Sequence, residues 1–254
     1  MGVHRRSFAK SLVRVFRLLF VTPLTAGAFA FLAALPPQAH SLALSDLRTE
    51  ARVLALDNGA TRRRFPDARV NAFLNEGQRQ IVLEARPILK SSNFELVAGT
   101  TWYSLPSDFL QINRVTHDYY TLPETTPDAL DRTSRWEETG ASATHYLVDF
   151  SSRTKIRLYP WPESSSSTGT VRYQYWAQAT DMSADADTPF NGIAELTPYH
   201  YVIAYFAAAK MSAIDGKTGL AALYLGEFRA GIERIKSEAK SRPSYRPGAA
   251  GRTQ

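Results

Sequence analysis

Residues 65–89, FPDARVNAFLNEGQRQIVLEARPIL, carry the clearest helical pattern of the chain. Pro66 suits the first turn of a helix, where its missing N–H costs nothing, and Asp67 suits the positive end of the helix dipole. Pro87 marks the end, because the residue before a proline is pushed out of helical geometry. Apolar or small residues recur at steps of three and four and share one face. They are Val70, Phe73, Leu74, Gly77, Ile81, Val82 and Ala85.

We expect this face to be buried in a core, because it carries no arrangement of residues typical of catalysis. The polar residues of the same stretch are expected to face elsewhere. They are Asn75, Glu76, Gln78, Arg79 and Glu84.

Composition sets the broad class of the protein. The chain has 254 residues, 44% of them hydrophobic, which is enough for one large domain or two small ones with a real core. It has no cysteine, so disulfides and thiolate metal sites are excluded.

The net charge of +6 is unevenly distributed along the chain. Residues 1–41 hold five basic residues and no acid, so residues 42–254 carry 25 basic against 24 acidic residues. The body is therefore close to neutral, and the high isoelectric point does not indicate that it binds nucleic acid.

Residues 1–41 resemble a targeting segment. A basic start that includes Arg5 and Arg6 leads into residues 18–35, which contain no charged residue. Ala39 and Ser41 satisfy a small-x-small cleavage pattern, and the arginine pair resembles a twin-arginine export signal. Three interpretations stay open at this point: a cleaved signal, a membrane anchor, or an upstream extension outside the working module.

Three further helices are predicted. Residues 45–56 form the first, with Ser45 as its N-cap. After Thr197-Pro198, the stripe Tyr199, Val202, Ile203, Phe206 and Ala207 indicates another, and the turn at residues 215–219 joins it to the last. That last helix carries Ala221, Leu225, Phe228, Ile232 and Ile235 at helical spacing.

Between the two helical pairs the hydrophobic period changes from 3.6 to 2, which indicates strands. Strands are expected at residues 94–97, 102–106, 110–119, 145–150, 155–160 and 171–177. Residues 121–143 are expected to be irregular, and residues 181–192 to form a polar linker. Val171, Tyr173 and Tyr175 should share one face of the last strand.

This order predicts an α+β protein. An antiparallel four-helix bundle, formed by residues 42–92 and 193–240, would carry a mainly antiparallel β domain at residues 93–180, inserted between its second and third helices. Residues 1–41 would lie outside the core. Residues 241–254 would form a flexible basic tail with too little apolar content to fold alone.

The sequence contains no complete motif for phosphate binding, calcium binding or catalysis. Residues 215–218 echo the end of a phosphate-binding loop, but Met211 stands where that loop needs glycine. Asp181, Asp185 and Asp187 lack the glycine and glutamate of a calcium-binding EF-hand. Arg62, Arg63 and Arg64 are expected to be a solvated loop, with a phosphate contact as the alternative. No nucleophile elbow or paired-histidine motif occurs, so no enzyme activity, metal or cofactor is predicted.

Aromatic residues concentrate in the β block. Most are expected to fill its core, since aromatic residues favour strands, while a protein contact surface or a sugar-stacking platform are the alternatives. Trp136 and Trp161 are the candidate contacts among them. The whole set is Trp102, Tyr103, Tyr119, Tyr120, Trp136, Tyr146, Tyr159, Trp161, Tyr173, Tyr175 and Trp176.

Several segments, in order, resemble the head-to-tail adaptor proteins of tailed phages. The similarity covers residues 42–240. Its segments are Leu44-Ser45-Asp46-Leu47, residues 73–80, Arg86-Pro87, residues 102–110, residues 158–162 and Leu196-Thr197-Pro198-Tyr199, followed by the Asp215 turn. The resemblance implies a structural virion protein at the head–tail junction, assembled in the host cytoplasm, and no enzyme activity.

The resemblance also implies partners. A ring, commonly of twelve subunits, would dock on the portal protein and join it to a tail nozzle or tail-tube protein, with phage DNA passing through the lumen. Helices would contact neighbouring subunits, the β part would face the tail, and the C-terminal segment would reach the portal. Arg242, Tyr245, Arg246 and Arg252 are the candidate partner contacts in that segment.

The rival hypothesis is an exported or envelope-anchored binding protein. It would be periplasmic, or held in the membrane through residues 18–35, and would use the aromatic β domain to hold glycan or a protein partner. Adaptors of this kind usually begin near the equivalent of Leu42, so the resemblance favours residues 1–41 being an extension.

Overall fold

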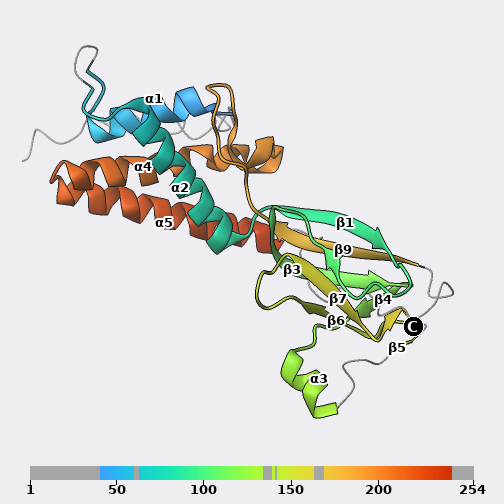
Figure 1. The fold of residues 1–254 in the computed structure, drawn as a ribbon. Coiled ribbons are helices and arrows are strands. Elements are labelled where there is room, and N and C mark those ends of the chain that lie inside the picture. The colour runs from blue at the N-terminus through green and yellow to red at the C-terminus, as the bar shows by residue number, and fades with distance from the viewer. Residues whose placement is uncertain (1–40, 60–62, 134–138, 141, 163–168, 242–254) are drawn as a thin grey trace, which may run out of the picture. The chain divides into compact units, whose positions relative to one another are not determined.

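The computed structural model describes residues 41–59, 63–133, 139–140, 142–162 and 169–241, and shows an α+β protein (Figure 1). Two helices precede a group of strands, and two helices follow it. The apolar segment 18–35, Trp136, and the tail residues Arg242, Tyr245, Arg246 and Arg252 lie outside the described residues. Within the described part of the chain, no helix combines the length and the apolar character needed to cross a membrane.

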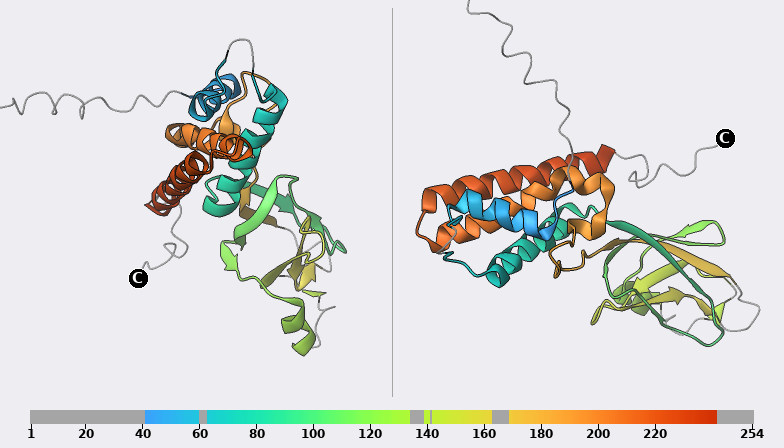
Figure 2. Two further views of the ribbon diagram at one scale, coloured as in Figure 1. Left: turned by 90° about the vertical axis from the view of Figure 1, so that its left-hand side faces the viewer. Right: turned by 90° about the horizontal axis from the view of Figure 1, so that it is seen from above.

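The helical part is organised around α4 (His200–Ile214), which contacts α1 (Leu44–Ala55), α2 (Asp67–Ala85) and α5 (Thr218–Ser241). Figure 2 shows α4 and α5 running side by side as a helical hairpin. Of the predicted apolar stripe, Val202, Ile203, Phe206 and Ala207 are buried, whereas Tyr199 is half-buried and precedes α4. Ala204, Ala208 and Met211 are buried as well. Because neighbours cover it on several sides, α4 is apolar around most of its circumference.

Close packing of α4 against its neighbours depends on two glycines. A Cβ added at Gly231 of α5 would lie 2.5 Å from a methyl carbon of Val202. A Cβ added at Gly77 of α2 would lie 3.0 Å from Cβ of Phe206. The absence of a side chain at these positions lets α4 approach both helices closely.

The apolar face predicted for α2 is largely confirmed, because Val70, Leu74, Ile81 and Val82 are buried. Pro66 is the N-cap and Arg86 ends the helix in a left-handed conformation, with φ 48°. The prediction that Asn75 and Gln78 face elsewhere is wrong, since both are buried. The physical reason is that they bind backbone groups of the chain that leads into α4.

The start of α1 also differs from the prediction. Ala43, rather than Ser45, is the N-cap, and Asp46 accepts a hydrogen bond from the Ala43 N–H at 3.0 Å. The N–H groups of Leu44 and Ser45 donate to the carbonyls of Asp187 and Asp185, at 2.8 and 3.2 Å. Backbone from a distant segment therefore satisfies amides that a side-chain cap would otherwise have to bind.

The larger sheet has the strand order β1-β9-β3-β4. All three pairings are antiparallel, and β9 is bonded on both sides. Its strands are β1 (Leu89–Glu95), β9 (Thr170–Ala177), β3 (Phe109–His117) and β4 (Tyr120–Leu122). The predicted strand at residues 94–97 thus begins earlier than expected, because Ser91, Ser92 and Asn93 pair with β9.

The second sheet has the order β2-β7-β6, with β2 (Tyr103–Ser104), β7 (Lys155–Tyr159) and β6 (His145–Val148). The predicted hairpin around residues 151–153 is confirmed by the antiparallel β6–β7 pair. Side chains from both sheets share one core, and the rings of Phe94 and Tyr103 stack with centroids 4.3 Å apart. Val171, Tyr173 and Tyr175 point together into that core, as expected.

Part of the segment predicted to be irregular is ordered. Residues 121–143 include most of β4, the helix α3 (Pro127–Thr133) and β5 (Thr139–Gly140), which pairs in parallel with β8 (Trp161–Pro162). Leu130 of α3 is buried beside Leu147 and Tyr159. This small satellite core explains why a short helix with little amphipathic pattern forms there.

Candidate functional site

The segment from Thr180 to Phe190 is bound to α2 by two buried amide side chains. Asn75 donates to the Met182 carbonyl at 3.0 Å and accepts from the Met182 N–H at 2.9 Å. Gln78 donates to the Thr180 carbonyl at 2.9 Å and accepts from the Phe190 N–H at 2.8 Å. These four bonds satisfy backbone groups of an irregular segment, as a buried loop requires.

The same segment is held by ion pairs at its surface. Arg79 contacts Asp181 at 2.6 Å, and Arg48 contacts Asp185 at 2.7 Å. Asp187 accepts from the N–H groups of Ser183 and Ala184, and these bonds hold the pKa of Asp187 below its usual range. The three aspartates considered for calcium therefore have partners within the chain. No cluster of three or more potential metal ligands occurs among the described residues.

Phe190 and Asn191 both have left-handed backbone conformations, with φ 54° and 58°. Phe190 is fully buried, and its ring lies against that of His200 at a centroid distance of 6.0 Å. The side chain of Asn191 accepts a hydrogen bond from the Thr180 N–H at 2.9 Å. The contacts hold the chain in an unfavourable geometry as it leaves the β part and enters η1 (Pro189–Gly192) and η2 (Ala194–Tyr199).

One end of the helical part is fastened by Arg52 of α1. Its guanidinium contacts Asp57 at 2.5 Å and Asp67 at 2.6 Å, and it donates to the carbonyl of Phe65 at 2.7 Å. Only 5% of the Arg52 side chain and 6% of the Asp57 side chain are exposed. The hydrogen bond from Arg52 lowers the pKa of Asp67. This network fixes the end of α1 to the start of α2.

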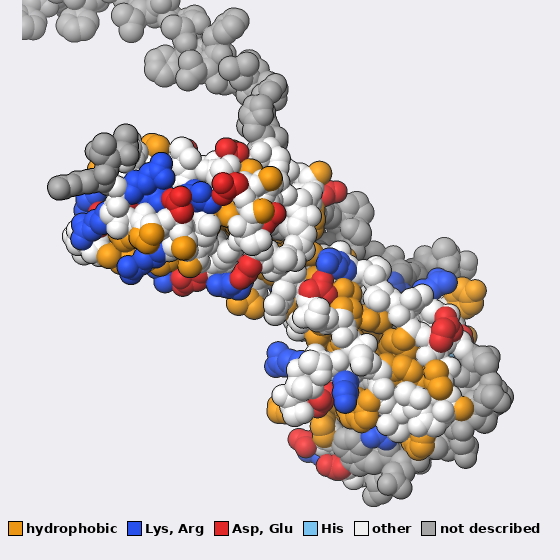
Figure 3. Space-filling view, turned by 45° about the horizontal axis from the view of Figure 1, so that its top comes forward, with side chains coloured by type: hydrophobic (Ala, Val, Ile, Leu, Met, Phe, Trp, Pro, Cys, Tyr) orange, Lys and Arg blue, Asp and Glu red, His pale blue; other side chains and the backbone are white. Residues whose placement is uncertain are grey.

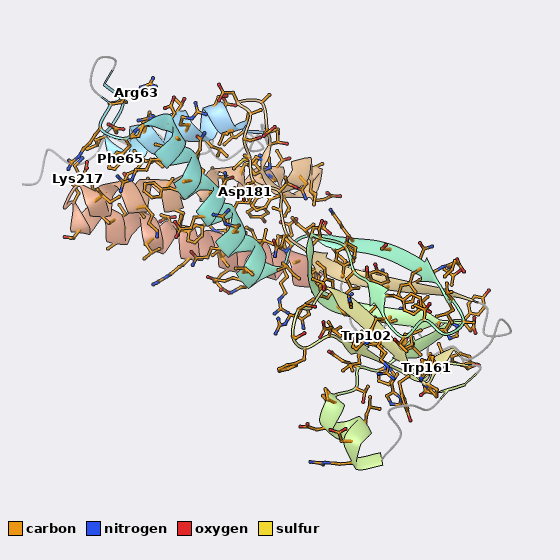
Figure 4. All side chains as sticks on the ribbon, in the orientation of Figure 1. Arg63, Phe65, Trp102, Trp161, Asp181 and Lys217 are labelled. Carbon is orange, nitrogen blue, oxygen red and sulfur yellow. The ribbon has the colours of Figure 1, made fainter. Side chains whose placement is uncertain are left out.

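Basic residues surround that end of the helical part, where Figure 4 labels Arg63, Phe65 and Lys217. Arg64 pairs with Asp215 at 2.8 Å, and Arg63 lies 3.6 Å from Asp67. Lys and Arg side chains are interspersed with Asp and Glu over the helical part (Figure 3). Asp67 and Asp215 partly neutralise Arg63 and Arg64, which weakens the phosphate-contact alternative for these two residues. Arg62 lies outside the described residues.

The turn between β3 and β4 exposes two aromatic rings. Asp118 and Tyr119 are its central residues, and both have positive φ values, 47° and 70°. That geometry normally favours Asn-Gly, so an aspartate and a tyrosine are held there at a conformational cost. Tyr119 is fully exposed and Tyr120 is 75% exposed. A strained turn that displays aromatic rings is a candidate protein contact.

Most of the other aromatic residues in the β block are structural. The buried ones are Tyr103, Tyr146, Tyr159, Tyr173, Tyr175 and Trp176. The guanidinium carbon of Arg157 lies 6.0 Å from the centroid of the Trp102 ring. The preferred prediction, that aromatic residues fill the sheet core, therefore holds for the six buried residues and fails for Tyr119 and Tyr120.

Of the predicted site residues, the structure describes Trp161 alone. Trp161, on β8, is half-buried, and its indole N–H has no hydrogen-bond partner among the described residues. The structure does not place the other predicted contacts. Sequence reasoning missed Tyr119 and Tyr120, because it assigned residue 119 to a strand that in fact ends at His117. A signal was present in Asp118, a common turn residue between two apolar strands.

Comparison with known proteins places the chain in a family. A family model described as SU10 adaptor protein matches residues 42–252, which is most of the chain and includes every described helix and strand. A search of curated proteins found no match. The match supports the resemblance to phage head-to-tail adaptors drawn from the ordered sequence segments.

Proposed function

Because the chain belongs to the SU10 adaptor protein family, we propose that it forms a ring that docks on the portal and joins it to the tail. The family is one of structural phage adaptors and not of enzymes. The ring would have twelve subunits, and phage DNA would pass through its lumen. The observation that carries this proposal is the family match across residues 42–252.

The proposal divides the chain into two parts. The helices α1, α2, α4 and α5, at residues 42–92 and 193–240, would form an antiparallel bundle, and residues 93–180 would form a β domain inserted between its second and third helices. The strand β1, which begins at Leu89, would lead into that domain. The bundle would contact neighbouring subunits. The β domain would face the tail nozzle or tail-tube protein, with the exposed Tyr119 and Tyr120 at one of its turns. An adaptor needs such separate surfaces for different partners.

The basic tail is the proposed contact with the portal. α5 ends at Ser241, and Arg242, Tyr245, Arg246 and Arg252 follow it. A segment of this composition can fold upon a partner. Deleting residues 242–254 should weaken binding to the portal while leaving the fold intact. An unchanged affinity would remove the tail from this role.

The working module is proposed to be residues 42–240, located at the head–tail junction of the virion. The family match starts at residue 42, which supports this choice. The intact mass of the protein purified from producing cells distinguishes the virion-adaptor hypothesis from export. A periplasmic product that starts near Leu42 would instead favour the exported-binder hypothesis.

Native mass spectrometry tests ring formation. The purified protein is mixed with the portal protein encoded in the same genome, and the mass of the complex is measured. The portal oligomer should gain the mass of twelve copies of this chain. A folded protein that adds no mass to an intact portal would contradict the proposal.

A further inference from the structure

The outward face of the four-stranded sheet forms a hollow of about 780 Å³ that is lined mostly by polar and charged residues. Two cross-strand rows run over it. Ser91, Gln174 and Arg114 lie opposite one another in the first row, and Asn93, Arg172 and Thr116 in the second. The face therefore presents hydroxyl, amide and guanidinium groups, while the opposite face of the same strands packs into the core.

The two arginines are diagonal neighbours on this face. Arg114 is opposite Gln174, and Arg172 stands two residues before Gln174 on β9. Such diagonal positions bring side chains within about 7–8 Å of each other. Arg114 is oriented by Thr121 of β4, whose hydroxyl accepts from its Nε at 3.1 Å and its Nη2 at 2.9 Å. The remaining donors of both guanidiniums are available to a ligand.

Neither arginine pairs with a carboxylate in the described part of the chain. By contrast, Arg48, Arg52 and Arg79 of the helical part each contact an aspartate. Asp118 also lines the hollow but pairs with neither arginine. The two neighbouring cations repel each other, so a carboxylate placed between them would be attracted to both.

We propose that this sheet face binds an acidic segment of a partner protein. Arg114 and Arg172 would pair with its carboxylates, and the hydroxyl and amide groups of both rows would bond to its backbone. The inference rests on the proposed function in one respect, namely that the partner is a virion protein that meets the β part. The complementary charge, and not the apolar content of the face, selects this occupant.

Nucleic acid fits the same face less well. Phosphate binding draws its strength from several cations, because each neutralised phosphate releases about one counterion. The lining of the hollow offers two arginines, fewer than the several cations that a run of phosphates requires. A short acidic segment needs only a few charged contacts and uses the neutral polar groups for its backbone.

The test measures fluorescence anisotropy of a labelled peptide of alternating Ser and Glu added to the full-length protein. A peptide of alternating Ser and Gln and a single-stranded oligothymidylate of similar length are the comparison probes. The acidic peptide should bind and the neutral peptide should not. The double variant R114Q/R172Q should weaken acidic-peptide binding about tenfold or more. The control R132Q/R229Q, which removes the same charge from exposed positions on α3 and α5, should leave it nearly unchanged.

The inference would be overturned if the acidic peptide did not bind, or if both double variants lost acidic-peptide affinity equally. It would also be overturned if oligothymidylate bound more tightly than the acidic peptide and R114Q/R172Q abolished that binding. The last result would assign the face to nucleic acid. If R114Q/R172Q does not fold, Arg172→Lys serves instead. It keeps the charge but loses the planar fork, and should weaken binding severalfold. Ring formation on the portal is measured separately, so failure of this inference would leave the adaptor proposal standing.

Discussion

The backbone N–H of Phe190 donates a hydrogen bond of 2.8 Å to the side-chain oxygen of Gln78, although 112 residues separate them. The Gln78 side chain is fully buried, and Phe190 has a left-handed backbone conformation. The strands follow α2 in the chain, and the segment containing Phe190 follows the strands. This bond therefore attaches that returning segment to α2. It therefore fixes where α4 begins with respect to α2.

Replacing Gln78 with alanine should reveal the strength of this attachment. The variant leaves the Phe190 N–H buried without a partner, which should lower the free energy of unfolding by about 2 kcal/mol. Urea-induced unfolding measures the change. The control is Gln80→Ala on the same helix. The Gln80 side chain donates a hydrogen bond to Glu84 at the surface and has no other partner among the described residues. Equal effects of the two variants would contradict the role assigned to Gln78.

Two glycines of α5 should respond in opposite directions to alanine. At Gly231 the new Cβ would meet Val202, and this overpacking should destabilise the protein by about 1–3 kcal/mol. At Gly226 nothing lies within 4 Å of the new Cβ, so helix propensity should stabilise it by about 0.5–1 kcal/mol. Thermal unfolding of both variants checks the pair. A stable Gly231→Ala variant would mean that α4 and α5 do not pack as closely as described.

The burial of His200 should make stability depend on pH. Burial lowers the pKa of His200 from its ordinary value of 6.5, an effect partly opposed by the hydrogen bond from the Leu42 N–H. The unfolded chain then binds the proton at a higher pH than the folded chain does. The contribution of His200 to stability is therefore complete above about pH 6.5 and is lost as the pH falls toward the pKa of His200 in the folded protein.

Titration of the His200 ring by NMR measures this directly, with His200→Asn to assign the signal. We expect the pKa of His200 in the folded protein to lie below 6.5. A value at or above it would show that the ring is more hydrated, or nearer a negative charge, than the structure places it.

Tyr119 is expected to lower the stability of its turn while contributing to binding of the tail protein. Tyr119→Gly fits the positive φ without strain, so the fold should keep or gain about 0.5–1 kcal/mol. Binding to the tail protein should weaken, because an exposed aromatic ring is lost. Phe150→Gly removes another exposed ring, at the β6–β7 turn, and serves as the control. Unchanged tail-protein affinity in the Tyr119 variant would exclude this turn from the interface.

Sequence reasoning predicted the α+β class and the long helices because apolar periodicity reports burial directly. It failed where polar residues are buried by bonding to distant backbone. Asn75 and Gln78 look like surface residues of α2 until the segment at residues 180–190 is in place. Nothing local marks them, since their partners lie more than a hundred residues away in the chain.

Strands were harder to predict for a related reason. Ser91, Ser92 and Asn93 lack β propensity, but they lie in β1 because β9 supplies their partners. The same polar residues form one edge of the hollow that holds Arg114 and Arg172. Only the cross-strand register brings these residues together, so the sequence alone could not identify this candidate site.

Negative-stain electron microscopy of the protein mixed with the portal protein of the same genome tests the central claim most directly. We predict an added ring at one end of the portal, with twelve-fold symmetry and a central opening. A correctly folded protein that leaves an intact portal without added density would contradict the adaptor function and favour an exported binding protein.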